Sequence, residues 1–267
     1  MKNNHIVILL TACVQPNGMS FTKLQDSSIR KEQYIKSIIY YLENTKFNIV
    51  CVENTGFNFS SCLCHHKNSK RLECLTFYGN NYPKELGKGY GEAQIIKYAI
   101  DNSKHINKGT YIIKITGRLI IKNINSIINP LLLRISKNII QIDFYSKSFV
   151  NSTCFICPST WISKTIQLYE NHLNDTAGYY FEHMLYNSII KSSNILLYPI
   201  IPPFIIGISG TQNKPYINGP SIKYRKMNNL SFISNIYRIK GNNIMNYWYK
   251  CLLYKSIILD KLHKLTK

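Results

Sequence analysis

The chain has 267 residues, and its 45% of hydrophobic residues suffices to bury a sizeable core. No apolar stretch reaches the length of a transmembrane helix and no secretion signal is evident, so we expect a cytoplasmic protein. The 33 Lys and Arg against 13 Asp and Glu give a formal charge of +20, which favours nucleic acid, anionic lipid headgroups or diphosphates as partners. The abundance of Asn, Ile, Lys and Tyr leaves the alternative that much of this charge is compositional.

Short apolar runs alternate with amphipathic segments along the first 220 residues, which predicts strands and helices in turn. The predicted strands are His5–Cys13, Phe47–Glu53, Leu72–Phe77, Tyr111–Ile115, Ile139–Phe144, Thr153–Ile156 and Ile195–Tyr198. The predicted helices are Asp26–Leu42, Glu92–Asp101, Ile124–Leu133, Ser163–Glu170 and Tyr179–Ser192. We therefore expect an α/β domain over residues 1–220, with a single, mostly parallel, Rossmann-like sheet flanked by helices.

Residues 221–267 differ in character and are predicted to form a basic, amphipathic, helical tail. From Ile222 onward there are ten Lys or Arg and one acid, Asp260. One helical face carries Ile244, Trp248, Leu252, Ile258, Leu259 and Leu262, and the other carries Lys250, Lys261 and Lys264. This pattern fits contact with a membrane surface and equally fits packing on the domain, and it leaves both open.

The eight cysteines are scattered, which favours unpaired thiols in a reducing compartment. Two local clusters, residues 62–66 (CLCHH) and residues 154–157 (CFIC), lack the two spaced pairs that a structural zinc site needs. We therefore predict no metal site at either cluster.

Polar residues follow three of the predicted strands, where open α/β sheets bind ligands. The candidates for binding a nucleotide are Thr11 and Cys13 after the first strand, Asn54 after the second, and Thr116, Gly117 and Arg118 after the fourth. Arg118 is the sharpest candidate, because a guanidinium can bind two phosphate oxygens and stays charged at every relevant pH. A surface salt bridge is the alternative for Arg118.

The glycine-rich segment at residues 87–92 is predicted to be a turn that leads into a helix. Helix N-termini favour phosphate, so Lys88, Gly89, Gly91 and Glu92 are candidates for binding the donor. The alternative is a turn that binds nothing.

An acid at the start of the late helix, Glu182, is the candidate general base, with His183 next to it as the second choice. Neighbouring aromatic residues would desolvate this carboxylate and raise its pKa. The alternative is an acid that merely stabilises the helix N-terminus. Asp143, near the end of a predicted strand, is a further candidate base.

These motifs, in this order, resemble small bacterial glycosyltransferases of capsule and lipopolysaccharide gene clusters, which have a GT-A-like fold. The segments that carry the resemblance are Leu9–Cys13, Val52–Gly56, Lys88–Glu92, Lys114–Arg118, Phe181–His183 and Pro203–Gly210. It implies a nucleotide-sugar donor, an acceptor that is a surface polysaccharide or a glycan on a lipid diphosphate, and an enzyme at the inner face of the cytoplasmic membrane.

The resemblance also assigns roles to single residues. Glu182 stands where the family commonly has its catalytic base, and a single base fits an inverting reaction. Residues 116–118 stand where the family has its Asp-x-Asp metal motif, yet this chain has no carboxylate there. We therefore expect Arg118 to neutralise the diphosphate without a metal cofactor, with Mn²⁺ or Mg²⁺ as the alternative.

Three other functions remain as alternatives. The charge and the twenty Tyr residues fit a nucleic-acid-binding protein, although the basic residues collect in the tail. A different nucleotide-sugar enzyme, such as a phosphosugar transferase, would use the same binding residues. A membrane adaptor with a degenerate site would keep only the tail's function.

Overall fold

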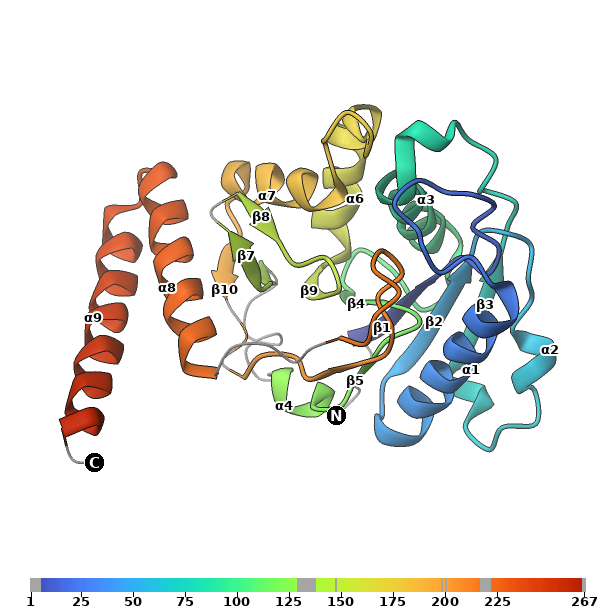
Figure 1. Cartoon of the computed structure of the whole chain (residues 1–267), viewed down its shortest axis with the longest axis horizontal. Helices are drawn as coiled ribbons and strands as arrows, with labels where there is room; N and C mark the ends of the chain where they lie inside the picture. The colour runs from blue at the N-terminus through green and yellow to red at the C-terminus, as the bar shows by residue number, and fades with distance from the viewer. Residues whose placement is uncertain are drawn as a thin grey trace.

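The computed structural model describes residues 6–128, 138–146, 148–197, 199, 201–216 and 222–265. Seven strands form its central sheet: β1 (Ile6–Ala12), β2 (Asn48–Glu53), β3 (Leu72–Thr76), β4 (Tyr111–Thr116), β6 (Ile139–Gln141), β9 (Cys154–Pro158) and β10 (Ile195–Leu197). Across the sheet they stand in the order β10-β6-β9-β4-β1-β2-β3 (Figure 1). Neighbours are parallel, except that β9 runs antiparallel to β4 and β6. The expected mostly parallel sheet is confirmed.

Helices cover both faces of this sheet. The longer ones are α1 (Ser27–Asn44), α3 (Gly87–Asn102), α6 (Ser159–Tyr169), α7 (Phe181–Lys191), α8 (Ile222–Ile239) and α9 (Asn243–Leu265). Alternate residues of β1 point to opposite faces: Ile8 and Leu10 pack with α1, and Val7 and Leu9 pack in the core that α3, α6, α7 and α8 complete. Because both faces are covered, the central strands β1, β2 and β4 are mostly apolar.

Short elements complete the fold. The brief helices are α2 (Ser60–Leu63) and α4 (Ile124–Ile127), and single 3₁₀ turns lie at Ser69–Arg71, Lys84–Leu86 and Glu170–His172. Two small antiparallel pairs join β5 (Ile120–Ile121) to β11 (Ile205–Ile206) and β7 (Phe144–Ser146) to β8 (Phe149–Val150). The predicted helix Ile124–Leu133 is confirmed only as α4, and its residues 129–133 lie outside the described ranges.

The register of the central strands brings their carboxyl ends to one edge. Thr11 of β1 pairs with Thr116 of β4, and Ala12 pairs with Glu53 at the end of β2. Glu53 is fully buried and accepts hydrogen bonds from the backbone N–H groups of Val14 (2.8 Å) and Phe57 (2.9 Å). One carboxylate thereby fixes the loops that follow both β1 and β2.

Several predicted elements have the wrong bounds; the helix predicted from Ser163, for example, begins at Ser159. The helix expected at Glu92 begins at Gly87, so the glycine-rich segment is the first turn of α3 rather than a turn before it. The strand expected over Ile139–Phe144 ends at Gln141. Asp143 after it is buried and accepts a hydrogen bond from Asn229 of α8 (2.6 Å).

The predicted tail is two helices that lie side by side, with α9 outermost (Figure 1). Leu230, Ile233 and Ile236 of α8 are buried in the main core, so α8 packs as part of the domain. Of the predicted apolar face of α9, Leu252 is partly buried against this core, whereas Ile244 and Trp248 are exposed. The side chains after Ile258 lie outside the described part.

Candidate functional site

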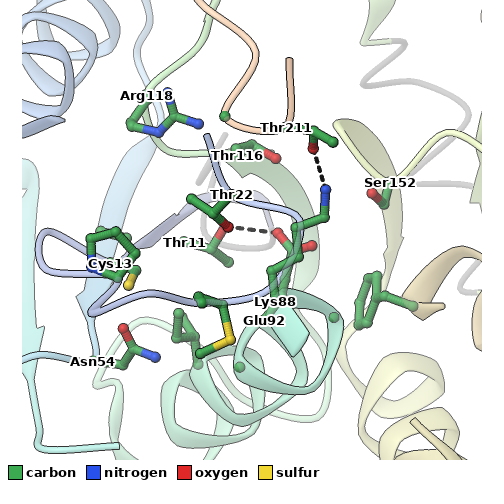
Figure 2. Close-up of a pocket in the computed structure, with 18 of the residues that line it drawn as sticks. Thr11, Cys13, Thr22, Asn54, Lys88, Glu92, Thr116, Arg118, Ser152 and Thr211 are labelled. Atoms are coloured by element: carbon green, nitrogen blue, oxygen red, sulfur yellow. Dashed lines mark hydrogen bonds between the residues drawn. The ribbon is translucent and has the colours of Figure 1, made fainter. Parts of the chain in front are cut away.

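A cavity of ≈ 250 Å³ opens at the carboxyl ends of β1, β2 and β4. Its floor and walls come from these strand ends and from the first turns of α3 and α7 (Figure 2). Most of the predicted site residues line it: Thr11, Cys13, Asn54, Lys88, Gly89, Gly91, Glu92, Thr116, Arg118 and Glu182. The structure thus brings together side chains that the sequence spreads over more than half of the chain.

Three predicted site residues do not line the cavity: Gly117, His183 and the further candidate base Asp143. A Cβ on Gly117 would lie 2.7 Å from the backbone oxygen of Thr11, so this glycine lets the chain after β4 pass close to β1. His183 Nδ1 accepts a hydrogen bond from the Tyr180 N–H (3.2 Å), and its ring stacks on Tyr180. His183 therefore caps the N-terminus of α7, and the structure gives no support to it as a base.

Arg118 lies at the cavity beside a second arginine, Arg30, which the sequence analysis missed. Both are buried, and Arg118 Nη1 donates to the side chain of Gln33 (2.9 Å) and to the backbone oxygen of Ile208 (3.0 Å). A Cβ on Gly210 would lie 2.5 Å from Arg118 Nη2 and 3.9 Å from Arg30 Nη1, so the two guanidinium groups border the same backbone.

The charge of this arginine pair is not neutralised by protein. Among the described residues neither Arg30 nor Arg118 forms a salt bridge, and Arg118 Nε is buried without a partner. Burial lowers the pKa of Arg118, and the neighbouring Arg30 lowers it further. A guanidinium nevertheless stays protonated in proteins. The cavity therefore holds two adjacent positive charges that an anion would stabilise.

Glu92 points into the cavity (Figure 2) and forms an ion pair with Lys114, a fully buried residue of β4. Lys114 Nζ contacts Glu92 Oε1 directly and donates to the backbone oxygen of Ser152 (2.7 Å). Thr11 donates to the same Glu92 oxygen (3.0 Å). Glu92 therefore joins β1, β4 and α3 and also lines the cavity, and its role in binding the donor stays a prediction.

The glycine-rich turn of α3 holds a protein carboxylate where the sequence predicted a phosphate. The Gly89 N–H donates to Asp175 Oδ2 (3.3 Å). A Cβ on Gly87 or Gly89 would lie 2.3 or 2.8 Å from the Asp175 side chain, so these positions must lack side chains. Asp175 was missed because nothing in its loop marks it; only the spacing of the glycines hints that something approaches the helix closely.

Asp175 is an acid in an unfavourable place. It is 1% exposed and lines the cavity, and its Oδ1 has no hydrogen-bond partner. Burial raises the pKa of Asp175 to about 6. The Gly89 N–H and the charge of Lys88 lower this pKa, and the negative charge of the nearby Glu182 raises it. Glu182 itself accepts a hydrogen bond from the Ser152 hydroxyl (2.6 Å). We call Asp175, Glu182 and Ser152 the carboxylate end of the cavity.

Uncharged groups gather at another part of the cavity, which we call the amide end: Cys13, Asn54 and Asn80. Both asparagines are buried, and their Oδ1 atoms have no partner. Asn80 Nδ2 donates to the backbone oxygen of Gln15 (2.9 Å), which leaves Asn80 Oδ1 as an acceptor for a ligand. Burial raises the pKa of Cys13 to about 11, so its thiol stays protonated.

Two loops meet over the cavity. The backbone N–H groups of Lys23 and Leu24 donate to the Gly210 oxygen (2.8 and 3.3 Å), which joins the loop after β1 to the loop at residues 209–211. Lys88 contacts the Thr211 hydroxyl from the first turn of α3 (Figure 2). These two loops thus cover the arginine pair, and their contacts with each other and with α3 hold them in place.

The cysteines take no part in a metal group in the described structure. All eight are free thiols; Cys62 and Cys64 are exposed near α2, and Cys154 and Cys157 are buried in β9. In the described ranges no three His, Cys, Asp or Glu side chains lie together as metal ligands would.

Comparison with known proteins gives no matching family model and no curated protein with significant similarity to this chain.

We predict that Lys114→Met lowers the free energy of unfolding by about 3 kcal/mol, because it leaves Glu92 without its buried counter-charge. The double variant Lys114→Met/Glu92→Gln is expected to recover at least half of this loss. Urea denaturation of both single variants and the double variant measures the coupling. Losses that simply add would contradict a coupled pair.

We also predict that Asp175→Asn stabilises the fold at pH 8, where the native carboxylate is charged and buried. As the pH falls through about 6, the native acid takes up a proton that the unfolded chain, with its ordinary pKa of 3.8, does not. The advantage of the variant should therefore shrink between pH 6 and pH 4. Thermal melting across this range tests it, with the exposed Asp101→Asn as control. An advantage that is independent of pH would contradict the prediction.

Proposed function

We propose that this chain is a glycosyltransferase, which moves a sugar from a nucleotide-sugar donor to a surface-polysaccharide or lipid-linked glycan acceptor. The observation that carries the proposal is the arginine pair, Arg30 and Arg118. These two buried cations form no salt bridge with any acid in the described part of the chain, and they line a cavity at the carboxyl ends of parallel strands. A diphosphate supplies the missing negative charge. The resemblance of the sequence to GT-A-like glycosyltransferases agrees with it.

The donor would span the cavity from end to end. Its nucleoside binds at the amide end, where the Oδ1 atoms of Asn54 and Asn80 can accept hydrogen bonds from N–H or O–H groups. Its diphosphate binds the arginine pair. The sugar then lies towards the carboxylate end. Figure 2 supports this order, because Ser152 lies on the opposite side of Glu92 from Cys13 and Asn54.

In the reaction, an oxygen of the acceptor bonds to the anomeric carbon while the bond from that carbon to the diphosphate oxygen breaks. The acceptor's proton passes to Glu182, which the Ser152 hydroxyl orients. The leaving diphosphate gains negative charge, and the fixed guanidinium groups stabilise that charge at the moment it develops. One base and a direct displacement give inversion at the anomeric carbon.

The strand end after β4 does not fit a divalent cation. Thr116, Gly117 and Arg118 supply no carboxylate, and the buried guanidinium of Arg118 would repel a second positive charge. We therefore propose that Arg30 and Arg118, rather than a metal ion, stabilise the diphosphate.

The outer face of α9 supports a further part of the proposal, contact with an anionic membrane. Ile244, Tyr247, Trp248, Tyr254 and Ile258 are exposed on α9, whereas its Tyr249 packs inward on Tyr237 of α8. From Ile222 onward the chain has ten basic residues and only one acid. This excess of positive charge complements anionic headgroups. No helix in the described ranges is long and apolar enough to cross a bilayer. We propose that α9 lies on the inner face of the cytoplasmic membrane, where lipid-linked acceptors are found.

We predict that Arg118→Ala weakens binding of a nucleoside diphosphate by about 10- to 100-fold, since a charge-assisted bidentate contact is lost. Calorimetry with UDP, GDP and dTDP identifies the nucleotide and measures the change, and Arg238→Ala, at an exposed position on α8, serves as control. Arg118→Lys should restore only part of the affinity, because an ammonium cannot bind two oxygens in a fork.

Glu182→Gln should lower the rate of donor hydrolysis or transfer at least 100-fold while leaving nucleotide binding intact. Near-normal turnover in both Arg118→Ala and Glu182→Gln would rule out the assignment. A strict requirement for Mn²⁺, abolished by EDTA, would exclude charge neutralisation by arginine alone.

For the membrane contact, we predict that the chain co-floats with vesicles containing phosphatidylglycerol and that salt weakens this binding. Replacing Tyr247, Trp248 and Ile258 together by Ser should reduce it at least tenfold, because each loses buried apolar area. Tyr78→Ser, an exposed ring at the far end of the sheet, is the control. Unchanged binding in the triple variant would show that this face of α9 does not meet lipid.

A further inference from the structure

The carboxylate of Asp175 lines the cavity but takes no part in the proposed reaction. Its Oδ2 accepts the Gly89 N–H, which fixes the orientation of the group. Asp175 lines the cavity, and its Oδ1 is buried without a hydrogen-bond partner among the described residues. An unpartnered buried acceptor costs free energy, which a ligand with a hydrogen-bond donor would recover.

The side chain of Asp175 occupies space that is free because α3 has glycines at two positions of its first turn. Gly87 has a φ of 76°, and a Cβ there would lie 2.3 Å from Asp175. Gly89 faces the same carboxylate, with its Cβ position 2.8 Å from Asp175 Oδ1. The first turn of α3 therefore places glycine backbone, and no side chain, against the carboxylate at the edge of the cavity.

The neighbours of Asp175 indicate which part of the donor reaches it. Glu182 is close enough to raise the pKa of Asp175, and Lys88 acts on it from α3. If Glu182 takes the acceptor's proton, the anomeric carbon lies next to Glu182, and the sugar ring must occupy this end of the cavity. A sugar presents hydroxyl groups, which are hydrogen-bond donors that suit a carboxylate.

We propose that Asp175 Oδ1 binds a hydroxyl group of the sugar that is transferred, so that the enzyme selects nucleotide sugars with a free hydroxyl at that position. This inference rests on the proposed function and names part of its substrate. Sites built to bond a substrate hydroxyl reject analogues that lack it, because the buried acceptor is then left unpaired.

Asp175→Asn tests the proposal by reversing the polarity of the group. The amide oxygen can keep the Gly89 N–H, so the NH₂ group faces the cavity and offers a donor where the native residue offers an acceptor. The measurement is calorimetric affinity of the full chain for a nucleoside diphosphate and for its nucleotide sugar, without acceptor. Asp101→Asn, an exposed acid near the end of α3, is the matched control.

We expect Asp175→Asn to bind the nucleoside diphosphate as the native chain does, within twofold, and the nucleotide sugar about 10- to 100-fold more weakly. Nucleotide sugars that lack one hydroxyl each provide a second measurement. One of them should bind the native chain weakly and lose no further affinity in the variant. This deoxy series on the native chain also serves if the variant does not fold.

The remaining outcomes overturn the proposal in different ways. Equal weakening of both ligands would make Asp175 a determinant of cavity shape alone. Unchanged affinity for both, with lower turnover, would make it a participant in proton transfer instead. If the native chain binds neither ligand, the proposed function itself fails, and the assignment of Asp175 fails with it.

Discussion

The ion pair between Lys114 and Glu92 ties the centre of the sheet to the helix that walls the cavity. Lys114 is fully buried on β4, and its charge is compatible with folding only because Glu92 meets it and the Ser152 oxygen accepts from it. Through Thr11, the same carboxylate also holds the end of β1. The positions of α3, and therefore of Gly89 and Asp175, follow from this buried contact.

Around this fixed centre, the charges of the cavity are separated. Among the described residues no acid forms a salt bridge with the arginine pair, while Asp175 and Glu182 lie together at the carboxylate end. A folded chain would gain stability by pairing these opposite charges, so their separation is costly. An elongated ligand that is anionic in one part and rich in hydroxyl groups in another offsets both costs, which is the character of a nucleotide sugar.

Local patterns found most strands, since a buried strand such as β1 is a short apolar run whatever surrounds it. They failed where tertiary contacts overrode propensity. Three glycines in six residues predict a turn, yet α3 includes them, because Asp175 and Tyr82 fill the space that side chains would take. In the tail, the apolar pattern left membrane contact and packing on the domain both open, and Leu252 proves to be partly buried against the core.

The sequence by itself determined the α/β architecture, the strand ends that carry Thr11, Asn54 and Arg118, and the excess of positive charge. These depend on periodicity and composition, which a chain carries before it folds. Only the tertiary structure revealed that Arg30 and Asp175 line one cavity, that Lys114 is the buried partner of Glu92, and that His183 caps a helix. Whether a charged side chain is buried, and which group it contacts, depends on segments that are distant in the chain. No local sequence pattern predicts such a contact.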